Sequence, residues 1–218
     1  PLMPLDKILF CGSLGDPLSN KDLCIILLWL NVESPGINIG MNTNGAIGST
    51  DLWTNIAYLI KDNPYSHTVF SIDGLEDTNH LYRQDVEWNK IMDRVKWFIG
   101  AGGNAVWKFI VFRHNMHQVK LAEELSQQLG FNKFQVDDHG RSYGPALDKD
   151  ANITHWILPH NEPLEPKPYD VPAGIERYKE THANFVAEEK VYNIQCEHLK
   201  DNDTYINAKG EVGPCCYH

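Results

Sequence analysis

Small and polar residues follow the apolar runs in the first two thirds of the sequence, and several of them can do chemistry. The segments concerned are residues 12–17, 43–45, 71–74, 113–115 and 137–138. Glycines in the first segment let a backbone approach a ligand, and the Asp16 carboxylate can hold a cationic amino group. Ser71 and Asp73 end a run that should be buried, and Arg83 can fork onto a ligand carboxylate. Each segment taken alone also fits a turn or a solvated ion pair.

Alternating strands and helices are predicted upstream of residue 139, and they would position these segments. The expected strands are 7–10, 37–41, 67–72, 106–112 and 134–136, with amphipathic helical stripes between them. The expected helix signals are Asn20 as the first N-cap, Ser49 or Thr50 as the second, an Asn115–Gln118 capping box before the last helix, and Gly130 as its stop. This alternation predicts an α/β fold with a parallel sheet, either open or curved into a barrel. The polar segments would then meet at the C-terminal ends of the strands.

The cysteines fall into two groups. Cys24 lies on an apolar helical stripe and fits the core, and Cys11 at a strand end fits packing better than metal binding. Cys196 and Cys215 flank residues 204–212, which read as a β-hairpin that would bring both thiols to one end, as a metal or cluster site requires. A disulfide would need a secreted protein, and nothing indicates export. Cys216 fits either a further ligand or the opposite strand face.

Histidines are numerous, but the sequence does not favour a histidine-based metal site. Five of the ten could suggest zinc, namely His114, His117, His139, His155 and His160. None forms a helical pair with a nearby glutamate of the zinc-protease kind. We therefore expect most of them to be surface residues.

Composition and charge exclude several classes of protein. The chain has 218 residues, 42% hydrophobic, with 19 Lys and Arg against 29 Asp and Glu. A net charge of −10 without a basic tract argues against nucleic acid or an anionic membrane as partner. The longest apolar run, 23–30, is too short to span a membrane, and a cytoplasmic location is expected.

Three segments are expected along the chain: a core at 1–139, a proline-rich connector and helix at 140–190, and a cysteine-bearing module beginning at 191–218. Six of the twelve prolines fall between 145 and 172, where no helical or alternating pattern is seen. The start without methionine and the end on paired cysteines suggest a fragment truncated at both ends.

The ordered set of motifs resembles the radical S-adenosylmethionine enzymes, and the pattern Cys-x13-Gly-x4-Cys looks like the opening of their SPASM extension. The resemblance implies a partial (β/α)6 TIM-like barrel whose first βα unit is missing. It places the methionine amino group at Gly15 and Asp16, and the ribose or carboxylate end at Ser71 and Arg83. The remaining implied residues are Asn115, which would line the same pocket, and Cys196 and Cys215, which would ligate an auxiliary 4Fe–4S cluster.

The resemblance implies that the full-length protein cleaves S-adenosylmethionine to a 5′-deoxyadenosyl radical, which abstracts hydrogen from a peptide or small-molecule substrate. A reduced flavodoxin or ferredoxin would supply the electron. One departure matters: the Cys-x3-Cys-x2-Cys loop that holds the radical 4Fe–4S cluster is absent from the sequence. We expect it upstream of Pro1, so the fragment alone should be inactive.

Two alternatives stay open. The first is a non-catalytic iron–sulfur or scaffold protein that keeps the barrel without the radical cluster. The second is an unrelated (β/α) enzyme that binds a phosphate or sugar at residues 12–17.

Overall fold

The apolar runs form a single parallel sheet. The computed structural model describes residues 6–11, 15–138, 144–150 and 152–161, together with the strand residues 205–206 and 212–213. The sheet strands are β1 (Lys7–Phe10), β2 (Asn38–Thr43), β3 (His67–Ser71), β4 (Ala105–Ile110) and β5 (Lys133–Asp137). They are hydrogen-bonded in the order β1-β2-β3-β4-β5, and every neighbouring pair is parallel. The prediction of an α/β fold with a parallel sheet is confirmed.

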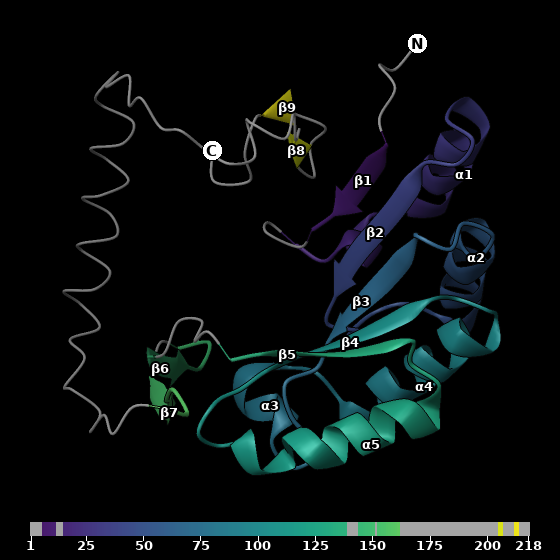
Figure 1. Cartoon of the computed structure of the whole chain (residues 1–218). Coiled ribbons are helices and arrows are strands. Elements are labelled where there is room, and N and C mark those ends of the chain that lie inside the picture. Colours follow the sequence, from purple (N-terminus) through teal and green to yellow (C-terminus); the bar gives the residue numbers. More distant parts are fainter. Residues whose placement is uncertain are drawn as a thin grey trace, which may run out of the picture.

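The helices cover one face of this sheet. The long helices are α1 (Leu23–Glu33), α2 (Thr50–Ile60), α4 (Trp88–Gly100) and α5 (Val119–Leu129), and the short ones are α3 (Asn79–Tyr82), η1 (Pro17–Ser19) and η2 (Met116–Gln118). The four long helices lie on the convex side of the curved sheet (Figure 1). Sequential strand order with right-handed crossovers has this result, because every connection returns over the same face. The arrangement is that of part of a TIM-like barrel, since a doubly wound sheet would carry helices on both faces.

Aromatic side chains fill the layer between sheet and helices. Trp53 of α2 stacks on Phe70 of β3 with ring centroids 5.2 Å apart, and Phe98 of α4 meets Phe70 edge-on at 5.7 Å. All three side chains are fully buried. Replacing one such ring by alanine removes about 3–5 kcal/mol of stability, so this cluster holds the helical layer to the strands.

The helix boundaries follow the sequence signals at two ends and depart from them at two others. Ser49 caps α2 as predicted, with its hydroxyl accepting from the Leu52 amide at 3.3 Å, and Gly130 ends α5 with φ +86°. Asn20 does not cap α1, because the helix begins three residues later and the Asn20 side chain accepts from the Asp22 amide instead. The Asn115–Gln118 capping box is also wrong, because both amides bond to other segments, described below.

Part of the expected connector forms a hairpin. Strands β6 (Gly144–Leu147) and β7 (Ile153–Ile157) pair antiparallel, and the Asp148 carboxylate organises the turn by accepting from the Asp150 and Asn152 amides. A turn held by an aspartate side chain leaves no hydrophobic periodicity in the sequence. For this reason the hydrophobic pattern did not predict β6 and β7. Strands β8 (Tyr205–Ile206) and β9 (Val212–Gly213) also pair antiparallel.

None of the helices that the structure describes combines the length and apolar character needed to cross a membrane.

Candidate functional site

The C-terminal edge of the sheet brings the polar segments together, beginning with β1 and β2. Asp16, in the loop after β1, accepts from the Thr43 hydroxyl at 2.7 Å and from the Asn44 amide at 3.1 Å through Oδ2. Its Oδ1 accepts from the Leu18 amide at 3.0 Å and caps η1. Gly15, with φ +148°, turns the chain into this cap. A carboxylate has about four acceptor positions, so Asp16 keeps capacity for one further donor.

A buried ion pair follows β3. The Asp73 side chain is fully buried; its Oδ2 accepts from Arg83 Nε at 2.6 Å and its Oδ1 from the Ile110 amide at 2.6 Å. Burial raises the pKa of the Asp73 carboxyl, against the lowering effects of Arg83, the Ile110 amide and Lys108. Asp73 therefore ties the loop after β3 to Arg83 through the ion pair and to the end of β4 through the Ile110 amide.

The side-chain amide of Asn115 holds the backbone of Asp73 in place. Its Nδ2 donates to the Asp73 and Ile110 carbonyls at 2.8 and 2.9 Å, and its Oδ1 accepts from the Phe112 amide at 2.7 Å. Asn115 has no exposed surface. In this structure the amide positions Asp73, and direct contact between Asn115 and a bound molecule stays a prediction.

Gln118 fixes the same loop from the start of α5. Its Oε1 accepts from the Leu75 amide at 2.9 Å and from the Thr78 hydroxyl, while its Nε2 donates to Asp77 Oδ1 at 2.7 Å. Gly74 is required here, because with φ +151° an added Cβ would lie 2.3 Å from Thr78 Oγ1. The loop after β3 is thus held at several points.

Arg83 and Ser71 offer polar groups toward the edge. The Arg83 side chain is 24% exposed, and Nε is the guanidinium nitrogen committed to Asp73. The outer nitrogens of Arg83 and the half-buried Ser71 hydroxyl have no hydrogen-bond partner within the described ranges. A guanidinium anchored through Nε presents its remaining donors in a fixed fork suited to a carboxylate.

Lys108 is a site residue that the sequence reasoning missed. It pairs in register with Ser71, so both side chains lie on the open face of the sheet, and its Nζ lies 3.0 Å from Asp137 Oδ2. The signal was present, because Lys108 is the single charged residue in the apolar run 105–112. A lysine at an inward position of a buried strand calls for a partner or a ligand.

His114 lies beside this edge in a neutral form. Burial, with His155, His117 and His80 acting in the same direction, lowers the pKa of His114 to about 4. Its ring stacks on Phe112 at 5.4 Å, and its buried Nε2 has no partner among the described residues. The β6–β7 hairpin packs close by, since His155 Nε2 lies 2.8 Å from the Leu81 carbonyl.

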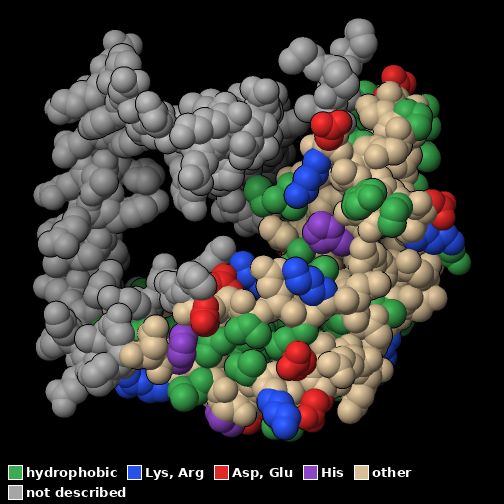
Figure 2. All heavy atoms as spheres, in the orientation of Figure 1, with side chains coloured by type: hydrophobic (Ala, Val, Ile, Leu, Met, Phe, Trp, Pro, Cys, Tyr) green, Lys and Arg blue, Asp and Glu red, His purple; other side chains and the backbone are tan. Residues whose placement is uncertain are grey.

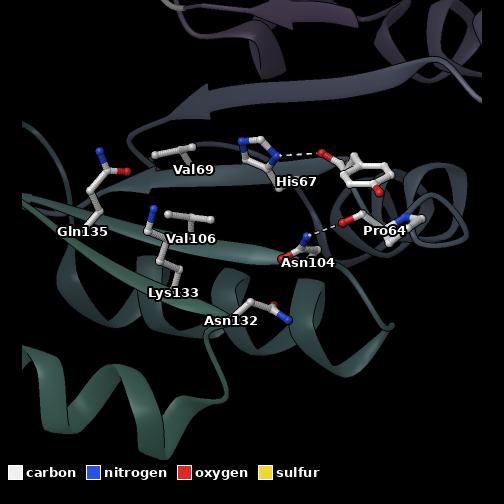
Figure 3. A pocket seen from close by; sticks show the side chains of 9 residues that line it. Pro64, His67, Val69, Asn104, Val106, Asn132, Lys133 and Gln135 are labelled. Atoms are coloured by element: carbon white, nitrogen blue, oxygen red, sulfur yellow. Dashed lines mark hydrogen bonds between the residues drawn. The ribbon is translucent and has the colours of Figure 1, made fainter. Parts of the chain in front are cut away.

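A shallow groove of about 320 Å³ lies at the other end of the open face (Figure 3). His67, Asn104 and Asn132 line it, and each of these side chains bonds to nearby backbone: the Tyr65 carbonyl, the Ser66 carbonyl and the Ala105 amide. These polar side chains therefore hold the backbone at the beginnings of β3, β4 and β5. The molecular face in Figure 2 carries basic and acidic side chains interspersed, rather than one continuous basic area.

The cysteines proposed as cluster ligands, Cys196 and Cys215, lie outside the described residues, as does Cys216. Of the cysteines in the described ranges, both Cys11 and Cys24 are partly buried, and burial raises the pKa of the Cys24 thiol. No three His, Cys, Asp or Glu side chains there come together as a metal ion would require.

Comparison with known proteins finds likeness in structure alone. No protein-family model and no curated protein matches the chain. SuiB from Streptococcus suis superposes with a TM-score of 0.55 at 13% identity, over 96% of this chain and 50% of SuiB. SuiB bound to S-adenosylmethionine superposes with a TM-score of 0.49 at 14% identity, over 83% of this chain and 35% of SuiB. SuiB bound to precursor peptide SuiA superposes with a TM-score of 0.49 at 13% identity, over 95% of this chain and 42% of SuiB.

A domain of pyruvate-formate lyase-activating enzyme from Bacteroides vulgatus gives a TM-score of 0.45 at 16% identity, over 59% of this chain and 76% of that domain. The chain spans half or less of the SuiB chains it matches. At these identities the likeness to SuiB shows that the two proteins share a fold.

Proposed function

We propose that the chain is part of a radical S-adenosylmethionine enzyme and that the C-terminal edge of its sheet binds S-adenosylmethionine. The observation that carries the proposal is the Arg83 guanidinium, anchored on buried Asp73 through Nε, with outer nitrogens that have no hydrogen-bond partner among the described residues. The shared fold with SuiB supports it, because that protein has also been solved with S-adenosylmethionine.

The residues present fit the groups of this cofactor. S-adenosylmethionine carries a carboxylate, an ammonium group and ribose hydroxyls. Arg83 would take the carboxylate and Ser71 a carboxylate or ribose oxygen, while the remaining acceptor capacity of Asp16 and the backbone at Gly15 would take the ammonium group. Asn115 would act on the same pocket by holding Asp73 in place.

An iron–sulfur cluster would supply the electron that cleaves the bound cofactor. The described residues do not fit such a cluster, since they bring no three metal-ligating side chains together. In this proposal their part would be to bind and orient the cofactor. Cys196 and Cys215 remain the proposed ligands of an auxiliary cluster, and a flavodoxin or ferredoxin the proposed reductant.

A peptide is the substrate class we favour. SuiB, which shares this fold, has been solved with its precursor peptide SuiA. The open face of the sheet would receive the peptide beside Lys108 and Asp137.

Calorimetric titration of the 218-residue chain with S-adenosylmethionine tests the binding step. Ser71→Ala removes a hydroxyl that has no partner among the described residues, so it should fold normally and weaken binding about 2- to 10-fold. Arg83→Gln should weaken binding more, by about 10- to 100-fold, because a charge-assisted pair is lost. Lys120→Gln on α5, where the side chain is 87% exposed, is the matched control and should bind as the parent does.

Absence of saturable binding by the parent chain would contradict the proposal. So would equal affinity of the Ser71→Ala and Arg83→Gln variants and the parent. Tight binding of inorganic phosphate that the same two variants leave unchanged would instead favour the alternative, in which residues 12–17 bind a phosphate.

A further inference from the structure

The β6–β7 hairpin contacts the short helix α3, which ends just before Arg83. His155 of β7 lies with Nε2 2.8 Å from the Leu81 carbonyl, and because a carbonyl oxygen only accepts, Nε2 is the donor (Figure 1). Backbone pairing joins the segment after the hairpin to the segment after β4, where the Arg113 amide donates to the Leu158 carbonyl at 3.0 Å. The hairpin is therefore attached to the C-terminal edge of the sheet, although it is not part of that sheet.

A small apolar core joins the hairpin to α3. Ala146 and Ile157 of the hairpin pack with Ile110 and Phe112, and all four side chains are buried. Tyr82, the last residue of α3, packs against this cluster, and its ring lies on the Phe112 ring with centroids 4.5 Å apart. The hairpin thus supplies two of the four buried side chains that support Tyr82.

Tyr82 in turn contacts the Arg83 guanidinium. The Arg83 Cζ atom lies over the Tyr82 ring, 5.0 Å from its centroid, which is within the range of a cation–π contact. Asp73 holds the same guanidinium through Nε at 2.6 Å. A single hydrogen bond fixes one nitrogen and lets the guanidinium plane tilt, whereas a ring under the central carbon restrains a second point. The outer nitrogens of Arg83 are therefore directed by Asp73 and Tyr82 together.

Helix α3 depends on its neighbours to keep Tyr82 in place. It has four residues, and its N-cap residue makes no side-chain capping hydrogen bond. A helix this short is not stable on its own in water, so its position is set by what packs against it. Asn79 fixes its beginning by accepting from the Asp73 amide at 2.8 Å. The hairpin fixes its end through Leu81 and Tyr82.

We propose that the β6–β7 hairpin is a positioning element for Arg83, which it holds through Tyr82 so that the outer guanidinium nitrogens face a ligand carboxylate at the C-terminal edge. Tyr82 is the positioning residue, and it acts through Arg83. The inference rests on the proposed function for the identity of the ligand, S-adenosylmethionine. The hold of the hairpin on Arg83 does not require a ligand.

Calorimetric titration of the 218-residue chain with S-adenosylmethionine tests the positioning. Tyr82→Leu should weaken binding about 3- to 30-fold, and Tyr82→Phe, which keeps the ring, should bind within about 2-fold of the parent. His155→Ala removes the bond of the hairpin to α3 and should weaken binding about 2- to 10-fold. Tyr58→Leu is the matched control, because it removes a ring of α2 that carries Lys61 Nζ 4.2 Å from its centroid, and it should bind as the parent does.

Two further titrations separate positioning from a general loss of structure. Decarboxylated S-adenosylmethionine lacks the group that Arg83 would bind, so Tyr82→Leu should leave its affinity unchanged. In the Arg83→Gln background, Tyr82→Leu should weaken binding of S-adenosylmethionine no further, because the residue it positions is gone. If Tyr82→Leu weakens both ligands equally, or adds its full effect to that of Arg83→Gln, the inference is overturned.

Urea unfolding without ligand tests the hold on Arg83 independently of the cofactor. The shift of the urea midpoint caused by Tyr82→Leu should be smaller in the Arg83→Gln background than in the parent, because the two side chains are in contact. Equal shifts would overturn the inference. Unequal shifts in a chain that does not bind S-adenosylmethionine would contradict the proposed function and still support the hold on Arg83. Unchanged affinity of Tyr82→Leu in a parent chain that does bind would overturn the inference alone.

Discussion

Replacing Asn115 by alanine should destabilise the protein severely, although Asn115 lies in a loop. Its fully buried amide satisfies three backbone groups, the Phe112 amide and the Asp73 and Ile110 carbonyls, at 2.7 to 2.9 Å. Each buried backbone group left without a partner costs about 1–3 kcal/mol. Some relief comes if water enters the space, so we expect a loss of about 3–5 kcal/mol, which lowers Tm by roughly 10 °C in a chain of this size.

Urea unfolding followed by circular dichroism measures this loss. Asn152→Ala is the matched control, because its amide bonds only to Asp148 in an exposed turn, and it should cost less than about 1 kcal/mol. Asn115→Asp keeps the acceptor but turns both donors into acceptors that face carbonyl oxygens. Protonation of the introduced carboxyl returns a donor, so this variant should be closer to the parent at about pH 4 than at about pH 7. An Asn115→Ala variant as stable as Asn152→Ala would refute the positioning role argued for Asn115.

Two further predictions follow from the loop after β3 and from His114. Gly74→Ala should lower stability by more than about 2 kcal/mol, because its φ of +151° and the 2.3 Å approach of the added Cβ to Thr78 Oγ1 cannot both be relieved. Gly36→Ala is the comparison: nothing lies within 4 Å of the added Cβ there, so only the backbone strain of φ +91° acts. Differential scanning calorimetry of the two variants decides this, and equal melting temperatures would contradict it. The pKa of His114 is lowered to about 4, so the unfolded chain binds a proton there before the folded chain does. The contribution of neutral His114 to the stability of the fold is therefore fully present above about pH 6.5, and it is lost as the pH falls toward 4. The urea midpoint of the parent should fall more over this range than that of His114→Phe, and parallel curves would show that His114 is not responsible.

Periodicity in the sequence was enough to predict the parallel α/β architecture. Burial alternates along strands and recurs every three to four residues along helices, so positions such as Ile56 and Phe70 identify their elements locally. Local capping signals worked where the partner lies within a few residues, as it does for Ser49. The segments at the C-terminal strand ends were identifiable for the same reason, since each directly follows an apolar run.

The destination of the polar side chains was decided only by the tertiary structure. Asn115 and Gln118 carry a helix-start pattern, yet their amides bond to Asp73 and Leu75, 42 and 43 residues away in the sequence. A buried backbone N–H or C=O group needs a hydrogen-bond partner, and the backbone groups after β3 are buried. The amides of Asn115 and Gln118 bond to these groups instead of capping their own helix, whose first amides water can satisfy. The pairing of Lys108 with Asp137 likewise depends on strand register. The sequence by itself determined which elements form and at which edge the polar segments gather. Only folding decided which polar groups are used in holding that edge and which, such as the Ser71 hydroxyl and the outer nitrogens of Arg83, keep no hydrogen-bond partner among the described residues. Long-range contacts leave no periodic pattern in the sequence.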